Sequence, residues 1–218
     1  MNSPEVIVID YGIGNVFSVC RAVEQLGGIA TLTSDPSRIR EAPRVILPGV
    51  GAFKSGMDRL RDSGLDDVVT DYATSGRPLL GICLGMQMLM ERSSEFGNHS
   101  GLGIVPGAVD RISVSDKLPT RHKIPHVAWS KLLVPLTNKS NVRSAGHILN
   151  DCFEQAYYFV HSFAAVPERA ENVLAEVEYG GSRIVAAVGF DNVVGVQFHP
   201  ERSASAGLQL LDRFMALS

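Results

Sequence analysis

The stretch PLLGICLG at residues 78–85 places a cysteine between an apolar strand and the start of a helix. Pro78–Ile82 is a nearly continuous apolar run, which is typical of a buried strand in a parallel sheet. Cys83 follows it, with Gly81 two positions before and Gly85 two positions after. Small residues at those two places are the layout of a nucleophile elbow, because larger side chains would collide across the sharp turn. Such a turn exposes the thiol above the carboxyl edge of the sheet, where the N-terminus of the next helix favours the thiolate.

Strands and helices alternate around this stretch through the first half of the chain. The strands are short and almost entirely apolar, and the apolar residues of the helices recur at helical spacing. This alternation predicts a parallel sheet that helices cover on both faces. The predicted strands are Val6–Asp10, Ala30–Thr33, Arg44–Leu47 and Pro78–Ile82, and the predicted helices are Val16–Leu26, Ala52–Leu60, Asp66–Thr74 and Gly85–Arg92.

The pattern changes after about residue 104, where short β-like runs follow one another until a final helix at about Ser205–Ala216. Gly180-Gly181, between two of these runs, is typical of a hairpin turn. We see neither an internal repeat nor a low-complexity linker. We therefore predict one α/β domain over residues 1–218, with a central mixed, largely parallel sheet flanked by helices. The predicted strands of this half are Ile104–Val114, His126–Leu133, Tyr157–His161, Leu174–Val177, Ile184–Val188 and Val194–Phe198.

The composition argues against several classes of protein. The 218 residues carry a formal net charge of −3, without the basic balance that favours a nucleic-acid partner. No apolar run approaches the roughly 18 residues of a membrane span, and the start, MNSPEVIVID, lacks the features of a signal peptide. Three cysteines without a CxxC pair argue against a disulfide framework or a structural zinc site. We expect a cytoplasmic protein with no membrane or nucleic-acid partner, no metal and no cofactor.

A second chemical segment, QFHPE at residues 197–201, ends another apolar strand. His199 and Glu201 are two positions apart, so in an extended chain they share a side, with Cα atoms roughly 6–7 Å apart. A carboxylate there would orient the imidazole and stabilise its cation, as the third member of a catalytic triad does. A lone histidine is more often structural. With Cys83 in the same α/β chain, however, we interpret Cys83, His199 and Glu201 as a nucleophilic triad.

The third segment, PGVG at residues 48–51, also directly follows a predicted strand. A loop beside the elbow can present a backbone N–H near Val50 or Gly51 to an oxyanion, joined by the N–H of Leu84. Glycines on both sides make a flip of the Gly49–Val50 peptide cheap, so the resting loop can present a carbonyl instead. By itself this segment is weak support, since PGVG is also an ordinary turn.

Taken together, GICLGMQ, QFHPE and LPGVGAF resemble the motifs of class I, triad-type glutamine amidotransferases. DYGIGN, PHVAW, YYFVHSF and HPERS narrow the resemblance to one branch of that class, the glutaminase subunits of imidazole glycerol phosphate synthases. The resemblance extends from about residue 6 to residue 214. It implies that Cys83 attacks the side-chain amide of glutamine, that His199 carries a proton to the departing ammonia, and that Glu201 orients His199.

The resemblance also implies where the substrate and the oxyanion bind. The N–H of Leu84 and an N–H of the Val50–Gly51 loop would hold the oxyanion. Gln87 and Glu95 match residues that hold glutamine, and Ser162 falls where the family's backbone contacts it. The implied substrate is therefore L-glutamine, hydrolysed to glutamate and ammonia.

In the resembling family the ammonia passes into a (βα)8-barrel cyclase subunit, which implies a heterodimer. The length of the chain is taken up by the hydrolase domain, so we expect a second chain to receive the ammonia. By their positions in the family, four residues are expected to contact the partner or the gate between the two active sites. These residues are Asn15, Trp129, Tyr158 and Arg202.

Departures from the family's pattern leave two further readings open. Ala128 and Ser130 flank Trp129 where the family usually shows Gly and Asn, Phe163 replaces a usual Tyr, and Arg202 begins a stretch that is usually Lys-Ser-Gly. The same glutaminase could thus serve a paralogous synthase, for example one that introduces nitrogen into surface sugars. A more remote reading is another cysteine hydrolase, such as a peptidase, or an inactive regulatory homologue. Gln87 and Glu95 argue against a peptidase, and the intact triad argues against inactivity.

Overall fold

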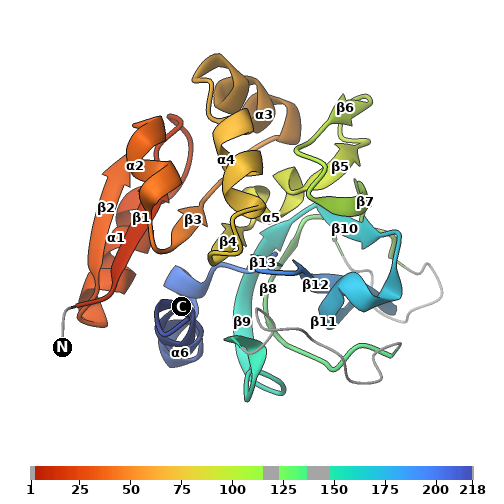
Figure 1. Ribbon diagram of the computed structural model, residues 1–218. Helices are drawn as coiled ribbons and strands as arrows, with labels where there is room; N and C mark the ends of the chain where they lie inside the picture. Colours follow the sequence, from red (N-terminus) through yellow and green to blue (C-terminus); the bar gives the residue numbers. More distant parts are fainter. Residues whose placement is uncertain (1–2, 115–122, 137–147, 218) are drawn as a thin grey trace.

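The computed structural model describes residues 3–114, 123–136 and 148–217, so parts of the predicted 1–218 domain lie outside the described residues. Figure 1 labels the elements on the ribbon. In chain order, the first are β1 (Glu5–Ile9), α1 (Val16–Gln25), β2 (Ile29–Thr33), α2 (Pro36–Glu41), β3 (Val45–Leu47), α3 (Phe53–Asp62), α4 (Asp66–Ala73), β4 (Leu79–Ile82), α5 (Leu84–Met88) and β5 (Met90–Ser93). The others are β6 (His99–Ser100), β7 (Val105–Arg111), β8 (His126–Lys131), β9 (Ala156–His161), β10 (Phe163–Pro167), β11 (Val173–Tyr179), β12 (Ser182–Phe190), β13 (Val193–Val196) and α6 (Ala204–Met215), with 3-10 turns at Ala170–Asn172 and Pro200–Arg202.

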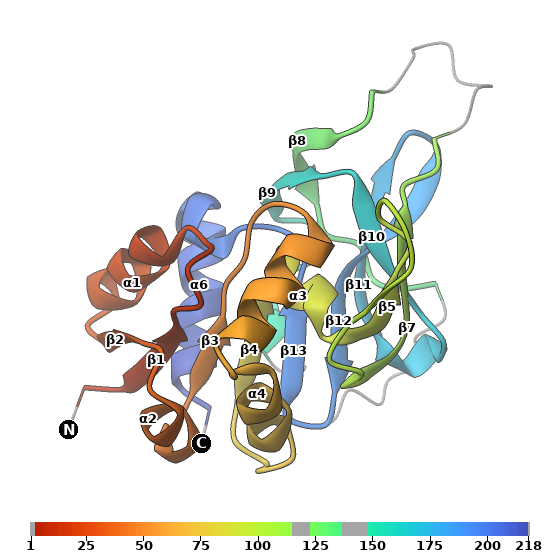
Figure 2. The ribbon, with the colours of Figure 1, turned by 90° about the horizontal axis from the view of Figure 1, so that it is seen from above.

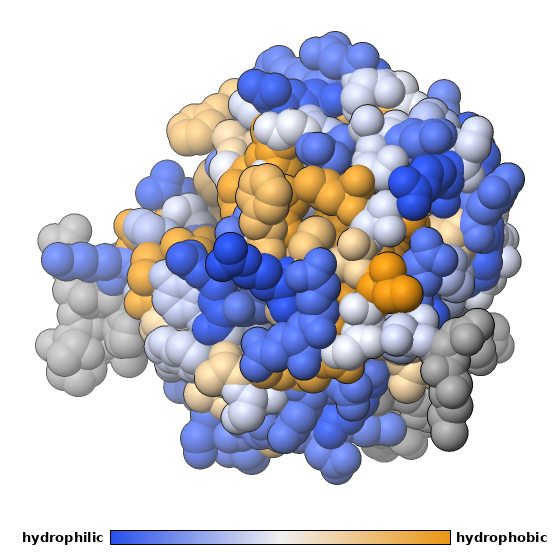
Figure 3. Space-filling model, turned by 90° about the vertical axis from the view of Figure 1, so that its left-hand side faces the viewer, coloured by the Kyte–Doolittle hydropathy of each residue, from blue (hydrophilic) through white to orange (hydrophobic). Residues whose placement is uncertain are grey.

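A seven-stranded sheet lies at the centre of the described chain, in the strand order β11-β12-β13-β4-β3-β1-β2. The pairs from β13 to β2 are all parallel, whereas β12 pairs antiparallel with both β13 and β11. The predicted mixed, largely parallel sheet is therefore confirmed, as is the hairpin turn at Gly180-Gly181. One edge of this sheet is β2, and Figure 3 views the molecule from that side, where hydrophobic and hydrophilic residues are mixed. None of the described helices has the length and apolar character needed to cross a membrane.

The parallel strands are apolar throughout because both faces of the sheet are covered. Val6 and Val8 of β1 belong to the same buried cluster as side chains of α1 and α6. Ile7 and Ile9 of the same strand face the opposite way and pack with α2, α3 and α4. Figure 1 shows α6 below the sheet and α3 and α4 above it. Alternate residues thus enter different cores, which removes the polar face of an ordinary strand.

A two-stranded ribbon, β8 with β9, lies on the side of the molecule opposite both chain termini (Figure 2). Its strands are antiparallel, with Val127 opposite Val160 and Trp129 opposite Tyr158. These pairs form the outer face, where Trp129 is 53% exposed. The pairs between them point inward, and His126 lies opposite His161 at one end of that inner face. The ribbon therefore has an apolar outer face and an inner face that contributes to the interior.

The predicted helix over 85–92 is wrong beyond Met88. Helix α5 ends there, and Met90 already pairs with Val105 in a separate four-stranded sheet, β10-β7-β5-β6. Every residue of α5 is buried, so the segment has no polar face that could mark where helical spacing ends. Some short elements were not predicted, among them α2 and β10, which have six and five residues.

The turn between β4 and α5 lies so close to its neighbours that no side chain fits at its two glycines. A Cβ atom on Gly85 would lie 1.9 Å from the carbonyl oxygen of Leu47 in β3. A Cβ atom on Gly81 would lie 2.9 Å from the backbone carbon of Gly85. The glycines that flank Cys83 are therefore required by backbone-to-backbone packing, as the elbow motif predicts.

We predict that Gly85→Ala destabilises the fold by about 3 kcal/mol or more, because the clashing atom is backbone and cannot rotate away. Urea unfolding of the full chain measures this change. Gly76→Ala is the control, since Gly76 has a φ of 79° but a Cβ atom added there would meet no described atom within 4 Å. It should cost about 1–2 kcal/mol from its left-handed backbone alone. Equal losses in the two variants would contradict the packing argument.

Candidate active site

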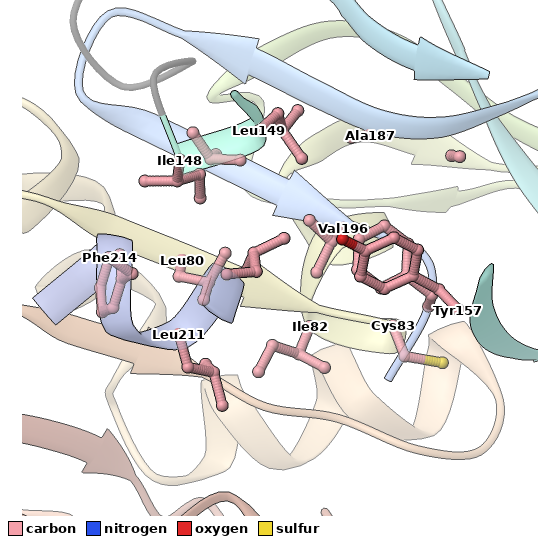
Figure 4. Close-up of a cluster of buried hydrophobic side chains, with 14 of the residues drawn as sticks. Leu80, Ile82, Cys83, Ile148, Leu149, Tyr157, Ala187, Val196, Leu211 and Phe214 are labelled. Atoms are coloured by element: carbon pink, nitrogen blue, oxygen red, sulfur yellow. The ribbon is translucent and has the colours of Figure 1, made fainter. Parts of the chain in front are cut away.

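Cys83 occupies a strained turn at the carboxyl end of β4. Its φ of 54° and ψ of −108° lie outside the usual regions for a residue with a side chain. The turn is anchored by the Cys83 N–H, which donates to the Val196 carbonyl at 2.8 Å. Figure 4 shows the sulfur turned away from the core side chains Leu80 and Ile82. The strained turn thus places the thiol at the border of the core, where it lines the pocket at the sheet edge.

His199 and Glu201 meet as the sequence predicts, and His199 reaches Cys83. The Nδ1 atom of His199 lies 2.8 Å from Oε1 of Glu201, and the imidazole also hydrogen-bonds to Cys83. The side chains of His199 and Glu201 are only 4% and 0% exposed. Burial alone lowers the pKa of His199, but the hydrogen bonds and the charges of Cys83 and Glu201 outweigh it and raise the pKa to about 10. The proton therefore resides on the imidazole at neutral pH.

Two further contacts hold the backbone of His199. Its N–H donates to the Tyr158 carbonyl of β9 at 3.0 Å. The hydroxyl of Ser203 donates to the His199 carbonyl at 2.6 Å and accepts the N–H of Tyr158 at 3.0 Å. Ser203 is buried and ties the turn after β13 to the ribbon. Sequence reasoning assigned Ser203 no role, and its place in HPERS was the only available signal.

Asn15 lies behind the triad rather than only at its outer rim. Its Nδ2 atom donates to Oε1 of Glu201 at 3.3 Å, and its Oδ1 accepts the hydroxyl of Ser18 at 2.8 Å. The Ser18 contact fixes which way the amide of Asn15 points. The other oxygen of Glu201, Oε2, is buried without a hydrogen-bond partner among the described residues. The hydrogen-bond chain that ends on Cys83 thus begins at the start of α1.

The PGVG loop lies directly against the elbow, with its carbonyl toward Leu84. The N–H of Leu84 donates to the Gly49 carbonyl at 3.3 Å. A Cβ on Gly49 would lie 2.9 Å from the Gly85 nitrogen, and Gly51 has a φ of 97°. On the other side, the hydroxyl of Tyr11 donates to the Pro48 carbonyl at 2.8 Å. The loop therefore adopts the carbonyl-inward arrangement that the sequence analysis expects for a resting state.

A pocket of about 280 Å³ opens beside Cys83. It brings together all of the predicted catalytic, oxyanion and substrate residues except Glu201, which lies behind His199. Glu95 has an additional contact, because its Oε2 accepts the N–H of Phe53 at 2.6 Å, just after the PGVG loop. The lining residues are Val50, Gly51, Cys83, Leu84, Gln87, Glu95, Pro125, Val160, His161, Ser162, Phe163 and His199.

The family model for glutamine amidotransferase class-I matches residues 7–217. The chain belongs to the class I glutamine amidotransferase family. Its relatives include the imidazole glycerol phosphate synthase subunit HisH 1 of Legionella pneumophila (strain Lens), 39% identical over 97% of this chain and 99% of the relative. The HisH subunit of Synechococcus elongatus is 41% identical over 98% of this chain and 94% of the relative, and that of Wolinella succinogenes is 42% identical over 95% and 97%.

Solved structures support the amidotransferase fold independently. PurLQS from Thermotoga maritima superposes with a TM-score of 0.72 at 20% identity, covering 99% of each chain. A crystal structure of a glutamine amidotransferase has a TM-score of 0.64 at 20% identity, covering 96% of this chain and 97% of the other. At these identities the likeness establishes the fold and carries no information about the substrate.

Three of the four residues predicted at the partner or gate of this amidotransferase form a path from the surface to the triad. The rings of Trp129 and Tyr158 lie 6.1 Å apart, and the ring of Tyr158 lies 6.4 Å from that of His199. The guanidinium of Arg202 lies 5.7 Å above the ring of Tyr158. Aromatic and cationic side chains therefore connect the outer face of the ribbon with the imidazole of His199.

Most of the departures from the family pattern lie away from the outer face. Ser130 points inward, where its hydroxyl lies 2.9 Å from Nε2 of His126. Ala128 lies opposite the buried Phe159, and Phe163 lines the pocket. Arg202 alone among the four departures is an exposed residue. The substitutions at residues 128, 130 and 163 therefore alter the interior of the amidotransferase more than the surface that a partner would contact.

We predict that His199 is protonated at pH 8 in the wild-type chain and that Cys83→Ala lowers its pKa, because the alanine lacks the hydrogen-bond partner and charge that help to raise it. NMR of labelled imidazole side chains, followed against pH, measures both states. The raised pKa also stabilises the fold, fully below pH 6.5, and this contribution is lost as the pH rises through about 10. A wild-type His199 that titrates near its ordinary value would contradict the assigned contacts.

Proposed function

We propose that this chain is the glutaminase subunit of an imidazole glycerol phosphate synthase of histidine biosynthesis. In this proposal it hydrolyses L-glutamine to glutamate and ammonia and passes the ammonia to a (βα)8-barrel cyclase subunit. The observation that carries the proposal is a histidine that contacts both a cysteine and a carboxylate, where the cysteine and the histidine line one pocket together with Val50 and Gly51 of the PGVG loop. Full-length similarity to HisH subunits supports the choice of synthase.

The first half of the reaction forms a thioester. The Cys83 sulfur attacks the carbon of the substrate's side-chain amide, and negative charge develops on the amide oxygen. The imidazolium of His199 then gives its proton to the departing nitrogen as the carbon–nitrogen bond breaks. Ammonia leaves, and a γ-glutamyl thioester stays on Cys83. Glu201 holds the imidazole in place and stabilises its cation while it waits for the substrate.

The second half releases glutamate. A water molecule attacks the thioester carbon, and His199 takes a proton from it, while the carbon–sulfur bond breaks and the Cys83 thiolate is restored. We propose that Gln87, Glu95 and the main chain at Ser162 bind the main-chain atoms of the substrate glutamine. All three line the pocket, and the carboxylate of Glu95 is a suitable partner for an ammonium group.

The oxyanion needs N–H donors that the resting loop does not provide. The N–H of Leu84 is taken by the Gly49 carbonyl, so a flip of the Gly49–Val50 peptide must free it and turn the Val50 N–H inward. A missing donor of this kind costs roughly 10²–10³-fold in rate. The isolated chain is therefore a poor glutaminase, which prevents the loss of ammonia when no acceptor is present.

The outer face of the ribbon is the surface that we assign to the cyclase. Val127, Trp129 and Val160 are 51%, 53% and 36% exposed there, and Val50 of the loop is 38% exposed. Exposed aromatic and aliphatic side chains of this kind are typical of protein interfaces. A partner seated on them touches both the loop and the Trp129–Tyr158 path to His199. We propose that the resulting heterodimer is cytoplasmic. We also propose that residues 1–218 form one amidotransferase domain.

We predict that glutamine hydrolysis by this chain rises by at least about 10²-fold when the cyclase subunit and its ligand are added, since one oxyanion donor is then restored. Steady-state glutamate production is measured for the chain alone, with the cyclase, and with the cyclase and its ligand. Cys83→Ala is the control: it should abolish hydrolysis, while ammonia added to the buffer should still support the cyclase reaction. Equal rates in all three conditions would contradict the gating. Acceleration by another synthase, with none by the cyclase, would identify a paralogous partner.

A further inference from the structure

Two buried histidines that the triad does not use lie on the inner face of the ribbon, next to the pocket. Nδ1 of His126 lies 3.1 Å from Nε2 of His161. Outward along the ribbon, Nε2 of His126 lies 2.9 Å from the Ser130 hydroxyl, and toward the pocket, Nδ1 of His161 lies 2.9 Å from the Phe163 carbonyl oxygen. The His126 ring is stacked at 4.0 Å on Tyr179 and at 5.0 Å on Phe159. The four groups therefore form one continuous hydrogen-bond chain.

The Phe163 carbonyl decides the direction of every bond in that chain. A carbonyl oxygen only accepts, so Nδ1 of His161 carries a hydrogen. In a neutral imidazole the other nitrogen, Nε2, must then accept, and Nδ1 of His126 donates to it. Nε2 of His126 then carries no hydrogen and accepts a hydrogen bond from the Ser130 hydroxyl. Burial keeps both rings neutral, because it lowers the pKa of His126 to about 4 and that of His161 to about 3.

The same carbonyl also orients two buried amides on the other side. Nε2 of Gln87 donates to the Phe163 oxygen at 3.0 Å and, with its second hydrogen, to Oε1 of Gln197 at 3.0 Å. Because its oxygen is engaged by Gln87, the amide of Gln197 turns its nitrogen the other way. That nitrogen lies 3.7 Å from the Cys83 sulfur. The side chain of Gln197 is fully buried, so solvent water does not compete with the sulfur for this N–H.

We propose that Gln197 is a further catalytic residue, whose amide N–H donates to the sulfur of Cys83. We further propose that His161, held by His126, is a positioning residue, because it holds in place the Phe163 carbonyl that orients Gln87 and, through Gln87, the amide of Gln197. The sulfur then has two donors, the His199 imidazolium and the Gln197 amide. A second donor stabilises the thiolate and holds it in one orientation. This inference rests on the proposed function, because the thiolate it stabilises is the nucleophile of that reaction.

Several ionisable groups surround the Cys83 sulfur, whereas the side chain of Gln197 is a neutral hydrogen-bond donor. His199 contacts the sulfur, with Glu201 behind it. Burial, and after it the nearby charge of Cys83, raises the pKa of the Tyr11 phenol. Glu95 and His161 also line the pocket. Removal of the Gln197 amide therefore changes hydrogen bonding to the sulfur without changing any charge.

The test is the pH profile of Cys83 alkylation by iodoacetamide in the full chain, followed by mass spectrometry of the Cys83 peptide. Gln197→Met keeps the length of the side chain and removes the donor. The midpoint of alkylation should rise by about one pH unit, as expected for the loss of one hydrogen bond to a charged group. Cys20, which is partly exposed in α1, is the internal reference, and its profile should not change. Gln197→Leu is the second variant if Gln197→Met does not fold.

A matched pair at His161 tests the positioning role. His161→Asn places an amide N–H close to the position of Nδ1, so the donor to the Phe163 carbonyl is kept. His161→Gln reaches the position of Nε2 but leaves no donor near that carbonyl. We expect the alkylation midpoint to stay at the wild-type value in His161→Asn and to rise in His161→Gln. A merely structural role for the histidine would move both midpoints alike.

An unchanged midpoint in a folded Gln197→Met or Gln197→Leu would overturn the inference, and equal shifts in the two His161 variants would overturn the part assigned to the histidines. The readout needs neither glutamine nor a partner chain. Failure of the proposed function, seen as a lack of glutamine hydrolysis with every synthase, is therefore distinguishable from failure of this inference.

Discussion

The close packing of the elbow against the PGVG loop is the constraint on which the rest of the site depends. Side chains are excluded at Gly49 and Gly85, because the backbones of the loop, of β3 and of α5 touch one another there. This contact holds the Leu84 N–H beside the Gly49 carbonyl, next to the positive-φ turn at Cys83 that places its sulfur in the pocket. One arrangement of closely packed backbone therefore places the proposed nucleophile, Cys83, and occupies the Leu84 N–H that we propose as an oxyanion donor.

His199 reaches Cys83 because the sheet brings distant parts of the sequence to one edge. Strands β4 and β13 are parallel neighbours, with Ile82 paired to Val196, so the residues after each strand emerge together. Cys83 follows directly, and Gln197, His199 and Glu201 follow the other strand. The ribbon then closes the site from the side, through the contact of the Tyr158 carbonyl with the His199 N–H. In the proposed function, hydrolysis and control by the cyclase would thus depend on the same backbone contacts.

The sequence predicted what short-range chemistry encodes and missed what depends on contacts between distant segments. The elbow, the QFHPE pair and the parallel strands follow from local pattern, and the structure contains them. Helix α2 also had a local signal, since Asp35 caps it and Pro36 begins it, but its six residues carry little periodicity. The roles of Gln197, Ser203 and the inward-facing His126 could not be predicted, because each depends on a partner from another strand or turn. Asn15 was expected at the interface, and its contact with Glu201 spans 186 positions of the chain.

The most direct test of the account is the structure of the Cys83→Ser chain in complex with the cyclase and with glutamine in the pocket, compared with the chain alone. We expect that in the complex the Gly49 carbonyl has left the Leu84 N–H, and that the N–H groups of Leu84 and Val50 both point at the amide oxygen of glutamine. A complex in which glutamine is seated beside residue 83 while the Leu84 N–H still donates to the Gly49 carbonyl would contradict it.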